Sequence, residues 1–235
     1  MTTYLSLTND LLQRLGEVVM DSTEFATARN VQSLAKAAIN SSVRELLHET
    51  QEWPFTLTTY TQTLSSGTNT YSLPADASSV DWESFYLKKF NDYVSAKPLR
   101  VIDYPEYLAH YRATDDNNGS DGYAPPDLIF QTQDLYFGVT PIPDDAYEIE
   151  YKYWAVPSDL DAHDDVCIVP DRFKNVVLDG AMVYMMLYRS NEQSASMHET
   201  KFKDGIKSMR RVLLDEPLEV KSTAVQQIVR NLRVR

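Results

Sequence analysis

The amino-acid sequence predicts an α+β protein in which helices from both ends of the chain form one helical bundle, with an antiparallel β-sandwich or small barrel inserted between them. The order of three hydrophobic patterns predicts this architecture. Apolar residues recur at helical spacing up to residue 53, alternate with polar residues from 54 to 157, and return to helical spacing after Pro170. The expected segments are 1–53 for the N-terminal helices of the bundle, 54–157 for the inserted β domain, 158–216 for the C-terminal helices of the bundle and 217–235 for an extended C-terminal tail.

Two helices are expected in the first segment. Thr8 is suited to cap the first helix, whose apolar face is expected to consist of Leu11, Leu12, Leu15, Val18 and Val19. The second helix is expected from about 26 to 50 and carries a narrow stripe of small side chains. Because small side chains let helices approach closely, we expect this helix in the middle of the bundle. Its stripe consists of Ala28, Val31, Ala35, Ala38, Ser42 and Leu46.

Residues 54 to 157 are rich in Thr, Tyr, Phe and Trp and are broken by turn residues, which is typical of antiparallel strands. Residues 65–68 are a hairpin candidate, and 115–123 are expected to be a surface loop. Asp103 and Glu106 resemble a capping box that opens a short helix. The expected strands are 55–64, 69–73, 80–89, 98–102, 128–131, 135–139 and 147–155.

The last part of the chain is expected to be helical from Pro170, a residue favoured in the first turn of a helix. A break near 190–194 separates two amphipathic helices, and the second ends before Pro217. The apolar face of the first helix is expected to contain Phe173, Val176, Val177, Ala181, Tyr184, Leu187 and Tyr188. The residues expected to face inward from the second are Met197, Phe202, Ile206, Met209, Val212 and Leu213.

Composition favours a soluble globular protein: of 235 residues, 43% are hydrophobic and 24% are charged. A net charge of −12 should repel phosphate backbones, so specific binding of nucleic acid is not expected. Neither a membrane span nor a signal peptide is recognisable, which predicts a protein kept in the cytosol. The single cysteine, Cys167, has no partner for an internal disulfide and is expected to be a small buried residue.

The C-terminal tail combines basic charge with an apolar stripe. Val225, Ile228, Val229 and Leu232 recur at helical spacing, with Arg230 and Arg233 beside them. Burying the four apolar side chains would stabilise a helix by about 6–12 kcal/mol, whereas ordering some fifteen residues costs about 15–30 kcal/mol. The stripe therefore needs a surface to bind. The pattern alone leaves open that the tail packs on its own domain or stays frayed.

No catalytic or metal-binding motif stands out, so the protein is not expected to be an enzyme or to hold a cofactor or metal. The histidines His48, His110, His163 and His198 are isolated, and the aspartates of 159–165 lack the glycine and glutamate of a calcium loop. Neither a nucleophile elbow nor a phosphate-binding loop is present. Fifteen tyrosines could form a platform for bases or sugars, but sheet packing and subunit contacts explain them better.

Five short stretches follow one another along nearly the whole chain. They are Glu52–Phe55, Tyr71–Asp76, Pro98–Tyr104, Pro141–Asp144 with the strand at 147–154 after it, and Ile168–Asp171, which opens a helix running through Gly180 and Ala181. In this order they resemble the bacteriophage head-to-tail adaptor family that includes tail tubular protein A of short-tailed phages. Each stretch alone is a turn, a strand or a cap, so the resemblance depends on their succession. The tail beyond Pro217 departs from the family pattern.

The resemblance implies a structural subunit of the virion neck, made in the host cytoplasm, that forms a dodecameric ring below the portal protein. Such a ring continues the channel for genomic DNA, which passes without specific binding, and carries a downstream tail or nozzle protein. We expect the tail to dock into the portal through Val225, Ile228, Val229 and Leu232, with Arg230 and Arg233 pairing portal carboxylates. The alternatives are a carbohydrate-binding or carbohydrate-cleaving tail component and a scaffold or regulatory protein that forms no ring.

Overall fold

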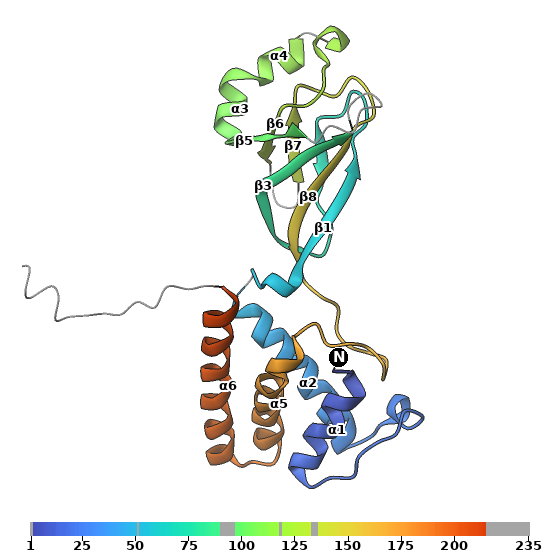
Figure 1. Cartoon of the computed structure of the whole chain (residues 1–235), viewed down its shortest axis with the longest axis vertical. Helices are drawn as coiled ribbons and strands as arrows, with labels where there is room; N and C mark the ends of the chain where they lie inside the picture. Colours follow the sequence, from blue (N-terminus) through green and yellow to red (C-terminus); the bar gives the residue numbers. More distant parts are fainter. Residues whose placement is uncertain (1, 51, 90–96, 118, 133–135, 215–235) are drawn as a thin grey trace, which may run out of the picture.

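A computed structural model describes residues 2–50, 52–89, 97–117, 119–132 and 136–214. The molecule is elongated, with a helical bundle at one end and a β-rich part at the other, as Figure 1 shows. Two neighbouring stretches of chain join the parts, because the chain leaves the bundle after helix α2 and returns to it before helix α5. The α+β fold predicted from the sequence is confirmed.

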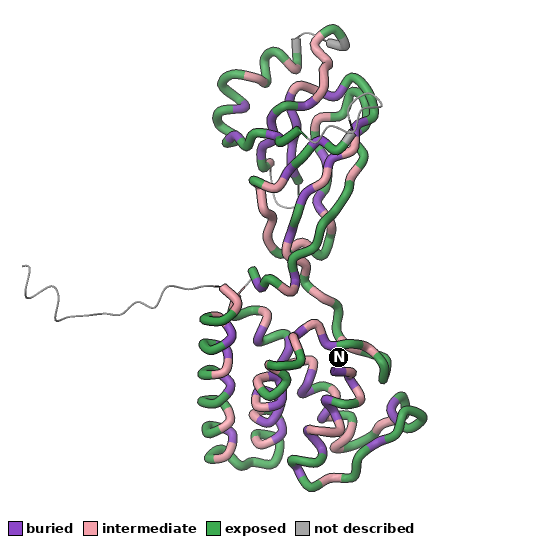
Figure 2. The backbone as a smooth tube through the Cα atoms, in the orientation of Figure 1, coloured by how far each residue is buried: buried purple, intermediate pink, exposed green. Residues whose placement is uncertain are grey.

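Four helices share the core of the bundle: α1 (Tyr4–Leu15), α2 (Val31–His48), α5 (Lys174–Tyr188) and α6 (Glu192–Leu213). Buried residues line the sides of the helices that face one another (Figure 2). Helix α5 packs against α1, α2 and α6, so it occupies the central place that the sequence assigned to the second helix. Gly180 makes this closeness possible, since a Cβ atom there would lie 2.2 Å from Ser42 Oγ.

Helix α1 begins and ends earlier than predicted. Thr3 caps it by accepting a hydrogen bond from the Ser6 N–H, while Thr8 is buried inside the helix and its hydroxyl donates to the Tyr4 carbonyl. Gly16, with φ of 71°, ends the helix in the left-handed conformation that glycine adopts readily. Val18 therefore lies beyond the helix and is 78% exposed, and Val19 is also exposed, so both were wrongly placed on its buried face.

The other helices of the bundle also have corrected boundaries. Residues 25–27 form a separate 3₁₀ turn, η1 (Phe25–Thr27), so α2 starts five residues later than expected. Pro170 precedes another 3₁₀ turn, η4 (Asp171–Phe173), and α5 follows it. The break expected near 190–194 is confirmed, since Ser190 has φ of 57° and Asn191 caps α6 by accepting from the Ser194 N–H.

The β-rich part contains two four-stranded sheets. The first has the order β1-β8-β3-β4 and the second the order β2-β7-β6-β5. All paired strands are antiparallel except β5 and β6, which run parallel because helices α3 and α4 lie between them in the sequence. The strands are β1 (Leu57–Thr63), β2 (Thr70–Ser72), β3 (Ala77–Lys89), β4 (Lys97–Pro98), β5 (Arg100–Ile102), β6 (Leu128–Gln131), β7 (Tyr136–Thr140) and β8 (Glu148–Ala155).

An aromatic core joins the two sheets. Phe85 of β3 stacks on Tyr151 of β8 with ring centroids 4.3 Å apart, and Phe137 of β7 meets Phe85 edge-on at 5.4 Å. Strands β6 and β7, which correspond to the expected strands 128–131 and 135–139, pair with each other in antiparallel fashion. The hairpin expected across 65–68 is wrong, because β1 pairs with β8 and β2 pairs with β7 in the other sheet.

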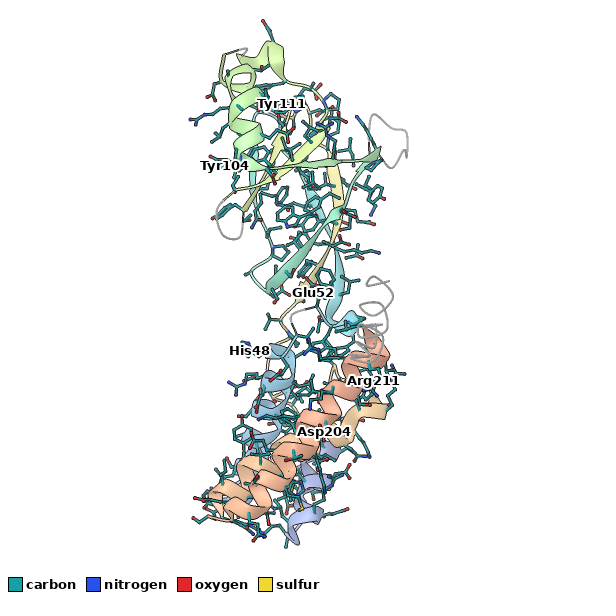
Figure 3. All side chains as sticks on the ribbon, turned by 90° about the vertical axis from the view of Figure 1, so that its left-hand side faces the viewer. His48, Glu52, Tyr104, Tyr111, Asp204 and Arg211 are labelled. Carbon is teal, nitrogen blue, oxygen red and sulfur yellow. The ribbon has the colours of Figure 1, made fainter. Side chains whose placement is uncertain are left out.

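Short helices cover the far end of the second sheet. The short helix expected after Asp103 is confirmed as α3 (Tyr104–His110), although the Asp103 side chain makes no capping hydrogen bond. Helix α4 (Arg112–Asn117) and the 3₁₀ turn η3 (Gly119–Gly122) occupy much of the region expected as a loop. The Tyr107 ring stacks on Phe130 of β6 at 3.9 Å, and Gly138 of β7 leaves the space that the Phe130 ring fills. Figure 3 shows Tyr104 and Tyr111 on this outer helical layer.

The link from bundle to sheet is anchored in the bundle core. Trp53 is fully buried, and its indole Nε1–H donates to the Leu46 carbonyl at 3.1 Å. Its ring stacks on Phe55 in the 3₁₀ turn η2 (Pro54–Thr56), which leads directly into β1. The direction in which the first sheet leaves the bundle is therefore set by packed side chains.

Candidate assembly surfaces

The acidic residues singled out in the sequence shape turns of the chain. Asp165 accepts hydrogen bonds from the N–H groups of Asp161 and Ala162, and Asp144 accepts one from the Tyr147 hydroxyl at 2.6 Å. These bonds hold the pKa of Asp165 below its ordinary value, because they stabilise the ionised carboxylate. Within the ranges that the structure describes, no group of three or more His, Cys, Asp or Glu could hold a metal ion.

Asp115 differs from the other acidic residues because it is partly buried beneath the outer helical layer. Its carboxylate accepts a hydrogen bond from the Thr140 hydroxyl at 3.3 Å. Burial raises the pKa of Asp115, the hydroxyls of Thr140 and Tyr107 oppose that rise, and the neighbouring charge of Asp116 adds to it. The arrangement ties α4 to the end of β7.

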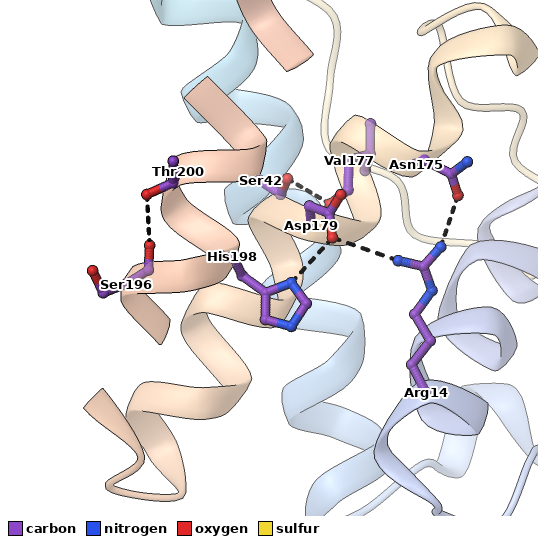
Figure 4. A network of polar contacts seen from close by, with 8 residues as sticks. All are labelled: Arg14, Ser42, Asn175, Val177, Asp179, Ser196, His198 and Thr200. Atoms are coloured by element: carbon purple, nitrogen blue, oxygen red, sulfur yellow. Dashed lines mark hydrogen bonds and ion pairs between the residues drawn. The ribbon is translucent and has the colours of Figure 1, made fainter. Parts of the chain in front are cut away.

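His198 joins three helices of the bundle. Its Nδ1 lies 3.0 Å from Asp179 Oδ1 on α5, and the Arg14 guanidinium of α1 lies 3.7 Å from the same oxygen (Figure 4). Arg14 also donates to Asn175 Oδ1 at 2.7 Å. The network is a polar clamp between helices. The other three histidines are exposed and well separated in the sequence.

The buried tyrosines support the sheet-packing interpretation. Tyr71, Tyr147, Tyr151 and Tyr153 belong to the core of the β-rich part. The Tyr71 hydroxyl donates to the Thr68 carbonyl at 2.7 Å, and burial raises its pKa. Side chains packed in this way present no face to a sugar or a base, which removes the main support for a carbohydrate-binding surface made by these four tyrosines.

Helices α3 and α5 each present a group of exposed apolar side chains. Helix α3 presents Tyr104 and Leu108, one helical turn apart, on the outside of the β-rich part. The last turns of α5 present Tyr184, Leu187 and Tyr188, which the sequence placed on the buried face. The correction has a simple cause: most residues from 177 to 182, in the middle of α5, are buried by its neighbours, whereas the last turns of the helix are exposed on this side. Exposed apolar groups of this kind mark surfaces for protein contacts.

The outer side of helix α6 also carries exposed apolar residues, one near each end of the helix. Met197 is 53% exposed and Val212 is 52% exposed, whereas Phe202, Ile206 and Met209 are buried as predicted. The inward placement of Met197 and Val212 was wrong, because α6 packs on the bundle from one side and solvent reaches the other. The hydrophobic pattern alone did not show which side that would be.

A shallow cavity of about 370 Å³ lies between α2 and the segment that returns from the sheets. Arg44 and Asp159 form an ion pair of 3.3 Å at its edge, and buried Cys167 lies deeper, with its thiol pKa raised by burial. Asn40 holds the segment in place by two hydrogen bonds to the backbone of Leu160. The cavity therefore belongs to the packing of this segment on the bundle.

The residues proposed for docking lie outside the described residues. They are Val225, Ile228, Val229, Arg230, Leu232 and Arg233, and the structure neither supports nor contradicts their role. No helix in the described part of the chain is long and apolar enough to cross a membrane.

Comparison with known proteins identifies the family. No curated protein matches the chain. The family model of the SU10 adaptor protein matches residues 2–226, which include the bundle, both sheets and the start of the tail as far as the first residue of its apolar stripe. The chain therefore belongs to the SU10 adaptor protein family, and its role is that of a structural adaptor in a bacteriophage.

Proposed function

We propose that the protein is one subunit of a closed ring in the neck of the virion, below the portal protein. The ring continues the channel for genomic DNA and offers its lower face to a downstream tail or nozzle protein. The match to the adaptor family over residues 2–226 carries this proposal. The resemblance to tail tubular protein A adds the number of copies, twelve, and the assembly of the ring in the host cytoplasm.

Separate cores support a division of labour within each subunit. Residues 1–53 and 158–216 supply the bundle, residues 54–157 supply the β domain, and 217–235 supply the tail. The bundle core and the sheet core share no residue, so each part can keep its shape while contacting a different neighbour. A net charge of −12 suits the wall of a DNA channel, because a like-charged surface does not hold the phosphate backbone.

The tail is proposed to attach each subunit to the portal. Deletion of residues 217–235 should abolish co-sedimentation of the protein with purified portal, while the rest of the chain stays folded by circular dichroism. Replacement of Val225, Ile228, Val229 and Leu232 by serine should have the same effect, because the stripe supplies the apolar contact. Replacement of Arg230 and Arg233 by glutamate should weaken binding in a manner that depends on salt.

A matched control deletes only the last two residues, which leaves the stripe and both arginines in place. Binding of this variant should equal that of the full chain. Unchanged portal binding by the long deletion would overturn the docking role of the tail and leave the adaptor role standing. Absence of the protein from mature virions, or normal infectivity of particles that lack it, would overturn the adaptor proposal itself.

A further inference from the structure

Helix α6 carries basic charge on its outer side although the chain as a whole is acidic. Between residues 201 and 211 it has five basic residues and one acidic residue. Lys203 and Lys207 are paired with Glu199 and Asp204 on the same helix. Lys201 and Arg211, by contrast, are exposed and form no ion pair with any residue that the structure describes.

The unpaired basic groups lie on one stripe of the helix. Lys201, Asp204, Ser208 and Arg211 follow one another three or four residues apart, which places them on the same side of α6. Figure 3 shows Asp204 and Arg211 on the side of the bundle turned toward the viewer. The exposed Met197 and Val212 adjoin the two ends of the stripe. We call this set of residues the α6 stripe.

A segment of opposite charge belongs to another part of the bundle. Residues 157–166 contain four aspartates and no lysine or arginine. Asp159 forms an ion pair with Arg44, and Asp165 accepts a backbone hydrogen bond within its turn. Asp161 and Asp164, by contrast, are exposed. Among the described residues, the ion-pair partner of Asp164 is the His163 ring, whose Nδ1 lies 3.8 Å from Asp164 Oδ1 and which carries charge only when it is protonated. We call residues 157–166 the aspartate segment.

The α6 stripe and the aspartate segment lie on opposite sides of the bundle. The Tyr4 N–H donates to the Asp165 carbonyl at 2.8 Å and the Leu5 N–H to the His163 carbonyl at 3.1 Å, which fixes the aspartate segment beside α1. Helix α6 packs on α5 instead. In Figure 1 α6 forms the left edge of the bundle and the aspartate segment, drawn in amber near the N-terminus, lies on the right.

We propose that the α6 stripe of one subunit docks on the aspartate segment of a second copy of this chain. The inference rests on the proposed ring and names the surfaces that close it. A cyclic ring needs two different, mutually complementary surfaces on opposite sides of each subunit. The two surfaces described here have opposite charge, and opposite charges across an interface set the register and speed the encounter.

Two other uses of the α6 stripe fit the observations less well. A pair of α6 helices facing each other about a twofold axis would bring like charges together, which is unfavourable. Duplex DNA would favour an uninterrupted row of cations, but Asp204 lies in the middle of the stripe. The exposed Met197 and Val212 at its ends offer nothing to a phosphate backbone, whereas methionine and arginine are common in protein interfaces.

A charge-swap experiment on the full-length chain tests the proposal. One variant carries Lys201→Glu and Arg211→Glu, and the other carries Asp161→Lys and Asp164→Lys. Each variant alone sets like charges against each other, so its self-association should be weaker than that of the wild type by about tenfold or more. An equimolar mixture restores opposite charges at both kinds of contact and should associate like the wild type. Sedimentation velocity at low and high salt measures the association.

A control matched to the Lys201→Glu, Arg211→Glu variant carries Arg100→Glu and Lys152→Glu, which makes the same change in net charge on the β-rich part and should leave association unaltered. Carbodiimide cross-linking of a mixture of ¹⁵N-labelled and unlabelled wild type should join Lys201 to Asp161 or Asp164 between chains. Cross-linking in the presence of portal extends this test to rings that form only there.

The results separate this interface from the proposed function. Variants that associate as the wild type does, or a wild type that forms no such link alone or with portal, would overturn the interface, even where single copies still bind portal. Binding of duplex DNA that is lost in the Lys201→Glu, Arg211→Glu variant while self-association stays unchanged would assign the stripe to DNA and also overturn the proposal. Failure of every chain to bind portal would count against the adaptor role instead.

Discussion

Substitution of Gly180 by alanine probes the point where three helices of the bundle meet. An added Cβ would lie 2.2 Å from Ser42 Oγ and 2.8 Å from the Phe202 ring, against 3.4 Å or more for an ordinary contact. Two neighbours on different helices would have to move, and overpacking of this kind costs about 3 kcal/mol. Alanine recovers about 1 kcal/mol through its better helix propensity. The net loss of unfolding free energy should therefore be about 2 kcal/mol.

Urea denaturation followed by far-ultraviolet circular dichroism measures this loss, and thermal unfolding should show a midpoint lowered by about 4–8 °C. Ser42→Ala alone should cost about 1 kcal/mol, because it removes the hydrogen bond from the hydroxyl to the Val177 carbonyl. The double variant should be more stable than the sum of the single losses predicts, since the nearest clashing atom is gone.

Gly205→Ala is the matched control, because its Cβ would meet only Val176 at close range, at 2.8 Å. It gains the same helix propensity and should stay within about 1 kcal/mol of the wild type. A Gly180→Ala protein as stable as the wild type would show that the three helices have room at this point and would refute the packing argument.

Three further predictions concern the β-rich part and the polar clamp. Gly138→Ala should displace the Phe130 ring, which lies 2.2 Å from the added Cβ, and undock the tyrosine stacked on it, lowering the near-ultraviolet dichroism. Asp115→Asn should raise the free energy of unfolding at neutral pH. Because the folded-state pKa of the Asp115 carboxyl is raised, its stabilising contribution is complete in acid and is lost as pH rises through that pKa. In denaturation curves, the extra stability of the variant over the wild type should therefore vanish in acid. Asp179→Asn should cost about 1 kcal/mol in urea denaturation by weakening the contact with His198, and an unchanged midpoint would show that the clamp contributes nothing.

The order of helices and strands could be predicted from hydrophobic periodicity, but the choice between equivalent local signals could not. Thr3 and Thr8 are equally good caps by residue type, and α1 starts at the first of them. The start of α1 is bonded to the Asp165 carbonyl, and Thr3 forms a bridge with Val166, a partner more than 160 residues away in the sequence. Local sequence carries no information about such a partner.

Strand pairing and surface exposure could not be predicted from the sequence, because both depend on distant parts of the chain. The parallel pairing of β5 with β6 depends on how α3 and α4 carry the chain back, which the strand residues do not encode. Leu187 and Met197 have the apolar character of core residues, yet both are exposed, because burial depends on which neighbouring helix reaches them. For the assembly surfaces, the sequence indicated the aspartates of the returning segment, whereas the α6 stripe became visible only once the outer side of α6 was known.

The adjacency of the two links between bundle and sheets has a consequence for how the protein folds. Leu57 at the start of β1 is paired with Trp154 near the end of β8, so a folded sheet holds the ends of a loop of about 100 residues together. Joining α2 to α5 through the whole unfolded connection of about 125 residues would cost about 1.4 kcal/mol more in loop-closure free energy than joining them through the roughly 27 residues that remain once β1 is paired with β8. A chain in which β1 pairs with β8 first therefore brings α2 and α5 close together before they pack. Early formation of the sheet should thus speed closure of the bundle.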